Sequence, residues 1–514
     1  MTDRRIEQLF AEANANNWNR RQIMKRAAGL GISVPAFVAA MMQAGPAFAQ
    51  DATPGATPVG TPGATPAATP ALTFDMSNPL GVDPAAPLNP FIFNGGLGIA
   101  YAENVNSIYQ QVYPESASTF NFESGQGLGP ALQPRFVGGT PPDVIDNSGA
   151  NNLDQTSLAD QGQLSDLGDL MSAVSFDTPD TMFKDTLVPG SMDSGIFDGK
   201  QQILYLTYTV TGLWTSGKLM RDNGYTYPKT WDEFMAMCAD IKANLPGVAP
   251  FVTTGVHTQY MRGFVFDQLV FKNGGLPAIG AIDNLEDNAW NSDPAKAAAS
   301  AILDLAKNGY ILPGFEGLDH TQSQTEWFNG KGVFLPCGSW LENESGVSSL
   351  GTVEAVDAFE MTVSPVPSLT ATDALPFEAI YASAGENFFV PEQAANKQGG
   401  KEWIRMLLSQ TGASYFSQAT RTLSVVNGAA EGLDAGPGLA SQQATIAAAG
   451  ANTLQSYYGG WYVDLNKATK DAMFQLMTQA ISVDEFCQTC QDAADAIKSD
   501  SGITKHTRPD YPAQ

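Results

Sequence analysis

The stretch Gly139–Ser148 reads GTPPDVIDNS and directs how the rest of the sequence is interpreted. Two prolines open a short apolar run, which predicts a buried strand that ends where the polar residues Asp146 and Asn147 begin. In open parallel sheets, ligands bind beyond the carboxyl ends of the strands. Asp146 and Asn147 are therefore candidate ligand-binding residues, and the alternative is that they only cap the next helix.

A similar unit precedes this stretch in the chain. The range Pro90–Gly98 predicts a strand that leads into a loop, where Asn94 and Gly95 are candidates to contact a ligand. A helical pattern follows as far as Tyr113. Later helix starts have capping patterns at Thr230–Glu233, Asn291–Pro294 and Ser482–Glu485. Strands that alternate with helices indicate an α/β fold with mostly parallel sheets.

The length and composition limit the possible classes of protein. The chain has 514 residues, of which 43% are hydrophobic, so more than one domain is expected. It holds 27 Lys and Arg against 53 Asp and Glu, a formal net charge of -26. Such an acidic surface argues against nucleic acid or an anionic membrane surface as the main partner. Three histidines argue against a His-rich metal site.

The first 49 residues are predicted to be a targeting segment. The stretch Asn19–Lys25 reads NRRQIMK and resembles a twin-arginine export signal. An apolar stretch follows, and Ala47–Ala49 has the pattern of a cleavage site. We therefore expect export to the periplasmic or extracellular cell-surface side. The alternatives are a cytosolic amphipathic helix and an uncleaved signal that acts as an anchor.

Residues 50–72 are predicted to be a linker. Thr-Pro pairs recur every four residues from Thr53 to Pro70, with small residues between them. A segment of this composition buries too little apolar surface to fold, and its prolines favour extended polyproline II. The globular body is expected to begin at about residue 73.

Catalytic motifs are not found in the sequence. It has no P-loop, no HExxH and no G-x-S-x-G pattern, and His257, His320 and His506 lie far apart in the sequence. Carboxylates are abundant, so a glycosidase pair stays open as an alternative. We expect no catalytic residue, no cofactor and no metal site.

The four cysteines leave two alternatives open. Cys487 and Cys490 lie inside the last predicted helix, where pairing would distort the helix because their Cβ atoms would be about 5–6 Å apart. Cys238 and Cys337 could pair in an exported protein. Buried free thiols are the other possibility for all four.

Several ordered motifs resemble a known family. The string PDV at 142–144 followed by Ala159–Leu164, the helix start in Tyr227–Phe234, and Trp327–Trp340 resemble extracellular solute-binding proteins of sugar ABC importers, the maltose-binding-protein-like family. Longer strings resemble the N-acetylglucosamine and diacetylchitobiose-binding subfamily. These strings are Gln133–Gly139, Ala281–Glu286, Pro336–Glu344 and Ser364–Leu369.

This resemblance implies a periplasmic-binding-protein-like fold of type II. Two α/β lobes would be joined by a hinge, with the ligand cleft between them. The N-terminal lobe would comprise residues 73–208 with 366–424, and the C-terminal lobe residues 209–365 with 425–514. The chain would cross between the lobes near Tyr208–Val210, Pro365–Pro367 and Ser424–Val425. A monomer would capture a small carbohydrate and deliver it to the membrane subunits of an ABC permease.

The resemblance also implies which residues bind the sugar. A pyranose has an apolar face and a hydroxyl rim, so it needs an aromatic platform and several polar side chains. Stacking aromatics are implied at Trp340, at the pair Trp461 and Tyr462, and at Tyr260, with Tyr457 and Tyr458 nearby. The remaining candidates are Asp146, Asn147, Asn94, Gly95, Glu342, Asn343, Glu386, Asn387, Tyr208, Thr209 and His257.

Each of these residues has a structural alternative. An aromatic side chain in an α/β protein usually belongs to the core, and a carboxylate often caps a helix. Two other functions also stay open: a secreted carbohydrate-active hydrolase, and the same binding fold with another oligosaccharide or a non-sugar ligand.

Overall fold

The computed structural model describes residues 74–124, 128–149, 151–434, 436–508 and 510–511. The predicted signal peptide, 1–49, and the predicted linker, 50–72, lie outside the described residues. Within the described ranges, no helix has both the length and the apolar character that crossing a membrane requires.

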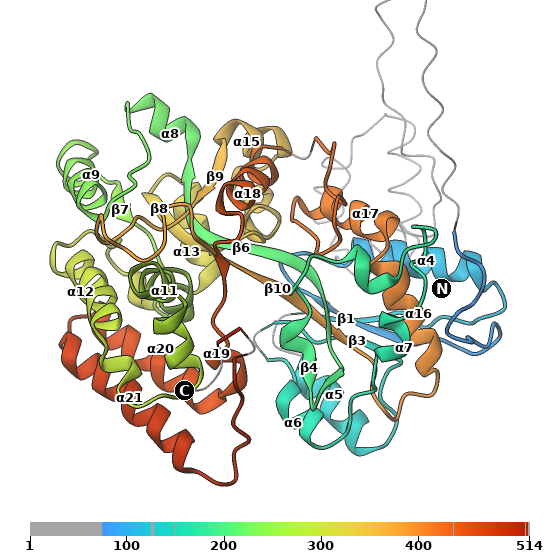
Figure 1. Cartoon of the computed structure of the whole chain (residues 1–514). Helices are drawn as coiled ribbons and strands as arrows, with labels where there is room; N and C mark the ends of the chain where they lie inside the picture. Colours follow the sequence, from blue (N-terminus) through green and yellow to red (C-terminus); the bar gives the residue numbers. More distant parts are fainter. Residues whose placement is uncertain (1–73, 125–127, 150, 435, 509, 512–514) are drawn as a thin grey trace, which may run out of the picture. The chain divides into compact units, whose positions relative to one another are not determined.

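A nine-stranded mixed sheet runs through the molecule in the order β2-β1-β3-β10-β6-β8-β7, with β11 beside β10 and β9 beside β6 (Figure 1). The strands are β1 (Pro90–Asn94), β2 (Asn121–Ser124), β3 (Val144–Asp146), β6 (Leu204–Ser216), β7 (Ala249–Phe251), β8 (Gly332–Gly338), β9 (Met361–Ser364), β10 (Ile380–Phe389) and β11 (Thr453–Leu454). A separate hairpin joins β4 (Ile196–Phe197) and β5 (Lys200–Gln201). The prediction of mostly parallel sheets was wrong, because the long strands β6 and β10 are antiparallel to each other and to β8 and β3, respectively.

Helices surround this sheet. They are α4 (Ala100–Val112), α5 (Leu128–Val137), α6 (Gln155–Asp160), α7 (Gly168–Met171), α8 (Gly217–Asp222), α9 (Trp231–Asn244), α10 (Gln259–Met261), α11 (Asp267–Asp283), α12 (Asp293–Lys307), α13 (His320–Phe328), α14 (Val347–Leu350), α15 (Val353–Phe359), α16 (Lys397–Leu407), α17 (Gln410–Thr420), α18 (Gly436–Ala449), α19 (Tyr458–Trp461), α20 (Val463–Met477) and α21 (Val483–Ser499). The predicted capping boxes are present at the starts of α9 and α21. At α12 the Ser292 side chain makes no capping hydrogen bond, although Pro294 occupies the first turn as predicted.

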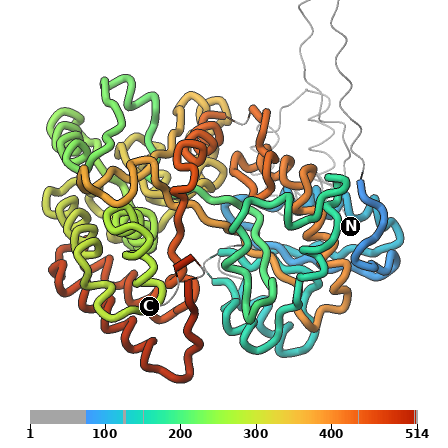
Figure 2. The backbone as a smooth tube through the Cα atoms, viewed as in Figure 1, coloured from blue at the N-terminus to red at the C-terminus, as the bar shows by residue number. Residues whose placement is uncertain are grey.

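Two large hydrophobic cores form towards the two ends of the long strand β6, which contributes Leu204 to one and Leu213 to the other. The N-terminal core includes Ile92 of β1 and Val105 of α4, with Trp403 of α16. The C-terminal core includes Phe234 of α9 and Trp290. Figure 2 shows the chain passing between these regions along the green β6 and the orange β10. Two cores that strands connect are the arrangement expected of two lobes with a hinge.

The positions of the crossings follow from which core each segment enters. Val366 and Ala379 pack in the C-terminal core, and Phe388 packs in the N-terminal core, so the chain moves between them along β10. Ala429 still packs in the N-terminal core. We propose that the second crossing is β10 and that the third follows Ala429, later than the sequence implied. The lobe boundaries themselves stay a prediction.

The cysteines are all free and buried. Cys487 and Cys490 lie within α21, where the sequence placed them. Cys238 packs in the C-terminal core, whereas Cys337 lies in β8 within a separate cluster that includes Trp214. Of the two alternatives that the sequence left open, the structure therefore has the free thiols.

Candidate ligand-binding site

A cavity of about 770 Å³ lies between Leu97, which packs in the N-terminal core, and Tyr260, which packs on the cluster that includes Trp214. The end of β1 and the loop that follows it, together Phe93–Gly98, form one side with Gly149 after β3. Tyr260, Phe264 and Trp340 form the other side, and Glu386 of β10 also lines the cavity. The loops after β1, β3 and β8 therefore meet here, as expected for strands whose carboxyl ends lie at a ligand site.

The C-terminal side of the cavity is an aromatic wall. The Trp340 ring meets the Tyr260 ring edge to face, with centroids 6.0 Å apart, and lies 5.8 Å from the Phe264 ring. A Cβ atom on Gly338 would approach the Trp340 ring to 2.1 Å, so glycine is needed for the indole to fold back over the end of β8. This wall offers the apolar surface on which a sugar ring can stack.

On the N-terminal side, Gly95 makes room for another aromatic ring. A Cβ atom at Gly95 would lie 2.0 Å from the ring of Phe93, which lines the same cavity. Asn94 lies beside them in the lining. Gly95 thus leaves space for the Phe93 ring. Its predicted contact with the ligand is compatible with this role.

Glu386 projects from an unusual backbone conformation. Its φ of 49° lies in the left-handed region, which non-glycine residues seldom occupy and which often marks functional positions. Burial raises the pKa of the Glu386 carboxyl to about 7; the Ser148 hydroxyl opposes this shift and the charge of Glu344 adds to it. The cavity thus contains a carboxyl group that gains and loses its proton near neutral pH.

A chain of polar contacts borders the aromatic wall. His320 Nε2 lies 3.3 Å from Glu344 Oε1, and His320 Nδ1 lies 3.2 Å from His257 Nδ1. Burial lowers the pKa of His320, but the hydrogen bond and charge of Glu344 outweigh it and raise that pKa above its ordinary value. Burial, together with the charge of His320, lowers the pKa of His257. Because one Nδ1 atom must accept the hydrogen bond, the two rings cannot both be fully protonated in this arrangement.

The groove continues beyond this cavity. A second compartment of about 1230 Å³ shares Gly149, His257 and Gln259 with the first. Its lining includes Arg262 and Asn387, which is one of the predicted residues. The space between the two cores therefore extends past the aromatic wall into a more polar region.

The structure brings seven of the predicted residues together. Those that line the aromatic cavity are Asn94, Gly95, His257, Tyr260, Trp340, Asn343 and Glu386. Sequence reasoning missed Phe93, Phe264, His320 and Glu344. His320 starts α13 and Glu344 follows β8, and no local pattern in the sequence indicates that these segments meet.

Other predicted residues are enclosed by protein in this conformation. Asp146 has no exposed surface, and its carboxylate accepts hydrogen bonds from the Tyr101 and Ser148 hydroxyls. Asn147 is buried too, because its amide bonds both the N–H and the carbonyl of Leu153. Glu342 is 3% exposed and forms an ion pair with Arg421. In this conformation the three side chains bond to protein groups, and their ligand contacts stay a prediction.

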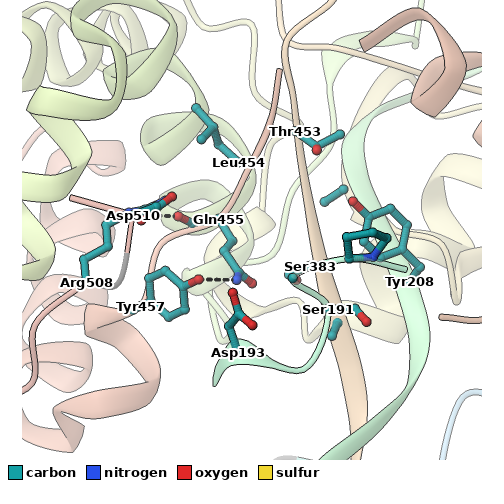
Figure 3. Close-up of a pocket in the computed structure, with 14 residues that line it drawn as sticks. Ser191, Asp193, Tyr208, Ser383, Thr453, Leu454, Gln455, Tyr457, Arg508 and Asp510 are labelled. Atoms are coloured by element: carbon teal, nitrogen blue, oxygen red, sulfur yellow. Dashed lines mark hydrogen bonds and ion pairs between the residues drawn. The ribbon is translucent and has the colours of Figure 1, made fainter. Parts of the chain in front are cut away.

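The tyrosines near the C-terminus divide between core and pocket. Tyr458 is fully buried and donates a hydrogen bond of 2.9 Å to Asp267 Oδ1, and Tyr462 is 2% exposed. Tyr458 is therefore a core residue rather than a platform. Tyr457 and Tyr208 line a separate pocket of about 270 Å³. Figure 3 shows this pocket, in which Gln455 bonds the Tyr457 hydroxyl.

Trp461 and Thr209 also lie apart from the aromatic wall. Trp461 stacks on Tyr457 and on His506, with centroids 4.9 and 5.3 Å away, and lines a small pocket of about 220 Å³ with Tyr462. Thr209 is nearly buried in β6, where its hydroxyl lies 2.9 Å from that of Thr207. Within the described residues, no group of three or more His, Cys, Asp and Glu side chains could hold a metal ion.

A comparison with protein families identifies the family of this chain. Residues 99–414 match the family described as bacterial extracellular solute-binding protein. The chain belongs to this family.

Relatives of this solute-binding protein extend the comparison. It is 32% identical over 435 residues to the diacetylchitobiose binding protein NgcE of Streptomyces coelicolor. The alignment covers 84% of this chain and 88% of that protein. It is also 28% identical over 163 residues to a probable sugar-binding periplasmic protein of Mesorhizobium japonicum. This alignment covers 31% of this chain and 38% of that protein.

Solved structures show the same fold. A chitin oligosaccharide binding protein superposes with a TM-score of 0.63 at 16% identity, covering 80% of this chain and 98% of that one. A complex of RafE with raffinose gives 0.62 at 15% identity, covering 80% and 100%. The fold of this solute-binding protein is therefore the α/β periplasmic-binding-protein fold of type II.

Proposed function

We propose that this protein is the sugar-binding component of an ABC importer. It captures an amino sugar or short chitin-type oligosaccharide, such as N-acetylglucosamine or diacetylchitobiose, and delivers it to a membrane permease. It acts as a monomer on the outer side of the membrane after export by its twin-arginine signal, and it catalyses no reaction. The relationship to the Streptomyces protein supports the sugar class.

The observation that carries this proposal is the aromatic wall. Trp340, Tyr260 and Phe264 line the cavity together with Asn94 and the glycine-rich loop Gly95–Gly98 that follows β1. Such a wall stacks on the apolar face of a pyranose, while Asn94, Asn343 and the carboxylates bond the hydroxyl rim. A few side-chain hydrogen bonds then decide which sugar is bound.

A thermal-unfolding panel tests the proposal. The ligands are N-acetylglucosamine, diacetylchitobiose, glucose, maltose and cellobiose. A ligand at 100 times its Kd should add about 2.7 kcal/mol to the free energy of unfolding, which raises the unfolding temperature. We expect the largest shift with diacetylchitobiose or N-acetylglucosamine. If no sugar in the panel shifts the transition, the sugar assignment is wrong.

The two carboxyl groups in the cavity favour one alternative, a secreted hydrolase. Glu386, with its raised pKa, and Glu344 would be its acid and its second carboxylate. Glu344, however, is bonded to His320 and Gln324. Prolonged incubation with diacetylchitobiose separates the two functions: a binding protein leaves the sugar intact, and a hydrolase releases N-acetylglucosamine.

A further inference from the structure

Apart from His257 and His320, the ionisable side chains that face the aromatic cavity are acidic. Of the seventeen described residues that line it, none is Lys or Arg, and two are the glutamates Glu344 and Glu386. The basic side chains Arg262, Lys467 and Lys470 line the neighbouring compartment instead. A ligand in the aromatic cavity therefore meets two carboxyl groups, and the cation that the described lining can offer, a protonated His320, is already bonded to Glu344.

The two glutamates differ in how fully the protein satisfies them. Glu344 receives a hydrogen bond of 2.7 Å from Gln324 and lies 3.3 Å from His320, which can carry a positive charge. Among the described residues, Glu386 forms no ion pair, and the neighbours that shift its pKa are the Ser148 hydroxyl and the Glu344 carboxylate. Glu386 is thus the cavity carboxylate that lacks a cation.

A third carboxylate lies behind Glu386. Asp146 of β3 pairs with Phe388 in the antiparallel ladder between β3 and β10, two residues from Glu386. Burial raises the pKa of Asp146, and the charge of Glu386 raises it further. The electrostatic field at this end of the cavity therefore favours a positive charge on the ligand.

Neutral and cationic sugars would interact differently with this electrostatic field. A hydroxyl or acetamido group can donate a hydrogen bond to Glu386, but it brings no charge. An ammonium group donates hydrogen bonds and also supplies the missing charge, and charge-assisted hydrogen bonds are about twice as strong as neutral ones. The attraction is larger in a partly buried site than in water.

We propose that the cavity selects a sugar with a free ammonium group, such as a partly or fully deacetylated chitin fragment, and that Glu386 pairs with that ammonium. This proposal rests on the sugar-binding function above and names its substrate class more narrowly. Aromatic stacking on Trp340 and Tyr260 places the sugar ring, and Glu386 distinguishes the substituent on its C2 atom.

Three β-1,4-linked dimers test the proposal because they differ in that substituent. Diacetylchitobiose carries acetamido groups, its deacetylated form carries ammonium groups, and cellobiose carries hydroxyl groups. Each is titrated into the full-length protein by calorimetry at low salt and near pH 7, where the Glu386 carboxyl is partly ionised and the sugar amine is partly protonated. We expect the ammonium dimer to bind at least about tenfold more tightly than cellobiose. If the ammonium dimer binds no more tightly than cellobiose, or less tightly than diacetylchitobiose, the proposal is wrong.

Matched variants then locate the effect. Glu386→Gln should weaken binding of the ammonium dimer by at least about tenfold and change binding of cellobiose by less than about threefold. Glu386→Asp, which keeps the charge, should retain the preference for the ammonium dimer. Glu316→Gln, the same change in the neighbouring compartment, should leave that preference unaltered. If Glu386→Gln weakens binding of both dimers equally, Glu386 does not distinguish a charged ligand from a neutral one and the proposal is wrong.

The same titrations separate this proposal from the function on which it rests. Binding of diacetylchitobiose without binding of the ammonium dimer overturns the proposal and leaves the proposed function in place. A lack of binding by all three dimers overturns both.

Discussion

The side-chain amide of Asn343 donates a hydrogen bond of 2.5 Å to the carbonyl oxygen of Gly96. Asn343 follows β8, whereas Gly96 lies in the loop after β1 and next to Leu97 of the N-terminal core. The bond therefore joins the two sides of the groove at the lining of the aromatic cavity. A hinge motion that separates the lobes would have to break it.

Removal of this bond should make the bound state shorter-lived. In an Asn343→Ala variant, we expect the sugar to dissociate about threefold to tenfold faster, because a hydrogen bond of this kind contributes about 1 kcal/mol. Stopped-flow fluorescence measures the rate. Asn244→Ala serves as the control, because within the described part of the chain the Asn244 amide donates to Asp240 on the exposed face of α9. An unchanged dissociation rate in Asn343→Ala would exclude a role of this contact in holding the groove closed.

Arg508 should be important for stability. Its guanidinium is 1% exposed and pairs with the fully buried Asp283 at 2.6 Å. In Arg508→Ala, Asp283 would keep its hydrogen bonds from the Tyr457 and Tyr458 N–H groups but lose its ion pair. We expect a loss of about 3–5 kcal/mol of unfolding free energy, measured by urea denaturation. The exposed pair of Lys498 and Asp287 provides the control, since Lys498→Ala should have little effect. Comparable losses in the two variants would contradict this explanation.

Lys272 should make stability increase with pH. Its ammonium is buried between the carbonyl oxygens of Val366 and Phe377, and desolvation lowers its pKa from 10.5 to about 7. Between these values the unfolded chain binds more protons than the folded protein, so the unfolding free energy rises with pH. Denaturation at pH 7, 8, 9 and 10 should show wild type gaining stability relative to Lys272→Met. A constant difference between the two proteins would mean that Lys272 keeps its ordinary pKa.

The four cysteines should react with a thiol reagent only after unfolding. All are free and buried, and burial raises the pKa of the Cys238 and Cys490 thiols, which keeps them protonated. We expect almost no rapid reaction of the native protein and four equivalents in denaturant. Fewer than four equivalents in unreduced, denatured protein would reveal a disulfide.

Local sequence signals predicted local structure well. The capping boxes at Thr230 and Ser482 mark the starts of α9 and α21, because such signals depend only on residues three apart. The strand before Asp146 is also where the sequence placed it. The family motifs led to Trp340, Tyr260 and Asn343, which meet in one cavity.

Tertiary contacts decided the features that the sequence did not reveal. Asn147 is a polar residue that follows a strand, which is the pattern expected of a ligand-binding residue. Its amide instead forms hydrogen bonds with the backbone of Leu153. Tyr458 is buried, and its hydroxyl donates a hydrogen bond to Asp267, which lies 191 residues earlier in the sequence. His320 and Glu344 meet across 24 residues, and His506 covers Trp461 from the far end of the chain. No periodicity or spacing encodes these pairings.

Titration of diacetylchitobiose into the wild-type, Trp340→Ala and Trp461→Ala proteins tests the central claim most directly. We predict one-to-one binding to wild type, and affinity at least about tenfold weaker in Trp340→Ala, because loss of a stacking aromatic removes about 2 kcal/mol of contact. Trp461→Ala should bind within about threefold of wild type, since Trp461 already stacks on Tyr457 and His506 outside the aromatic cavity. Unchanged affinity in Trp340→Ala would show that the sugar does not bind at the aromatic wall.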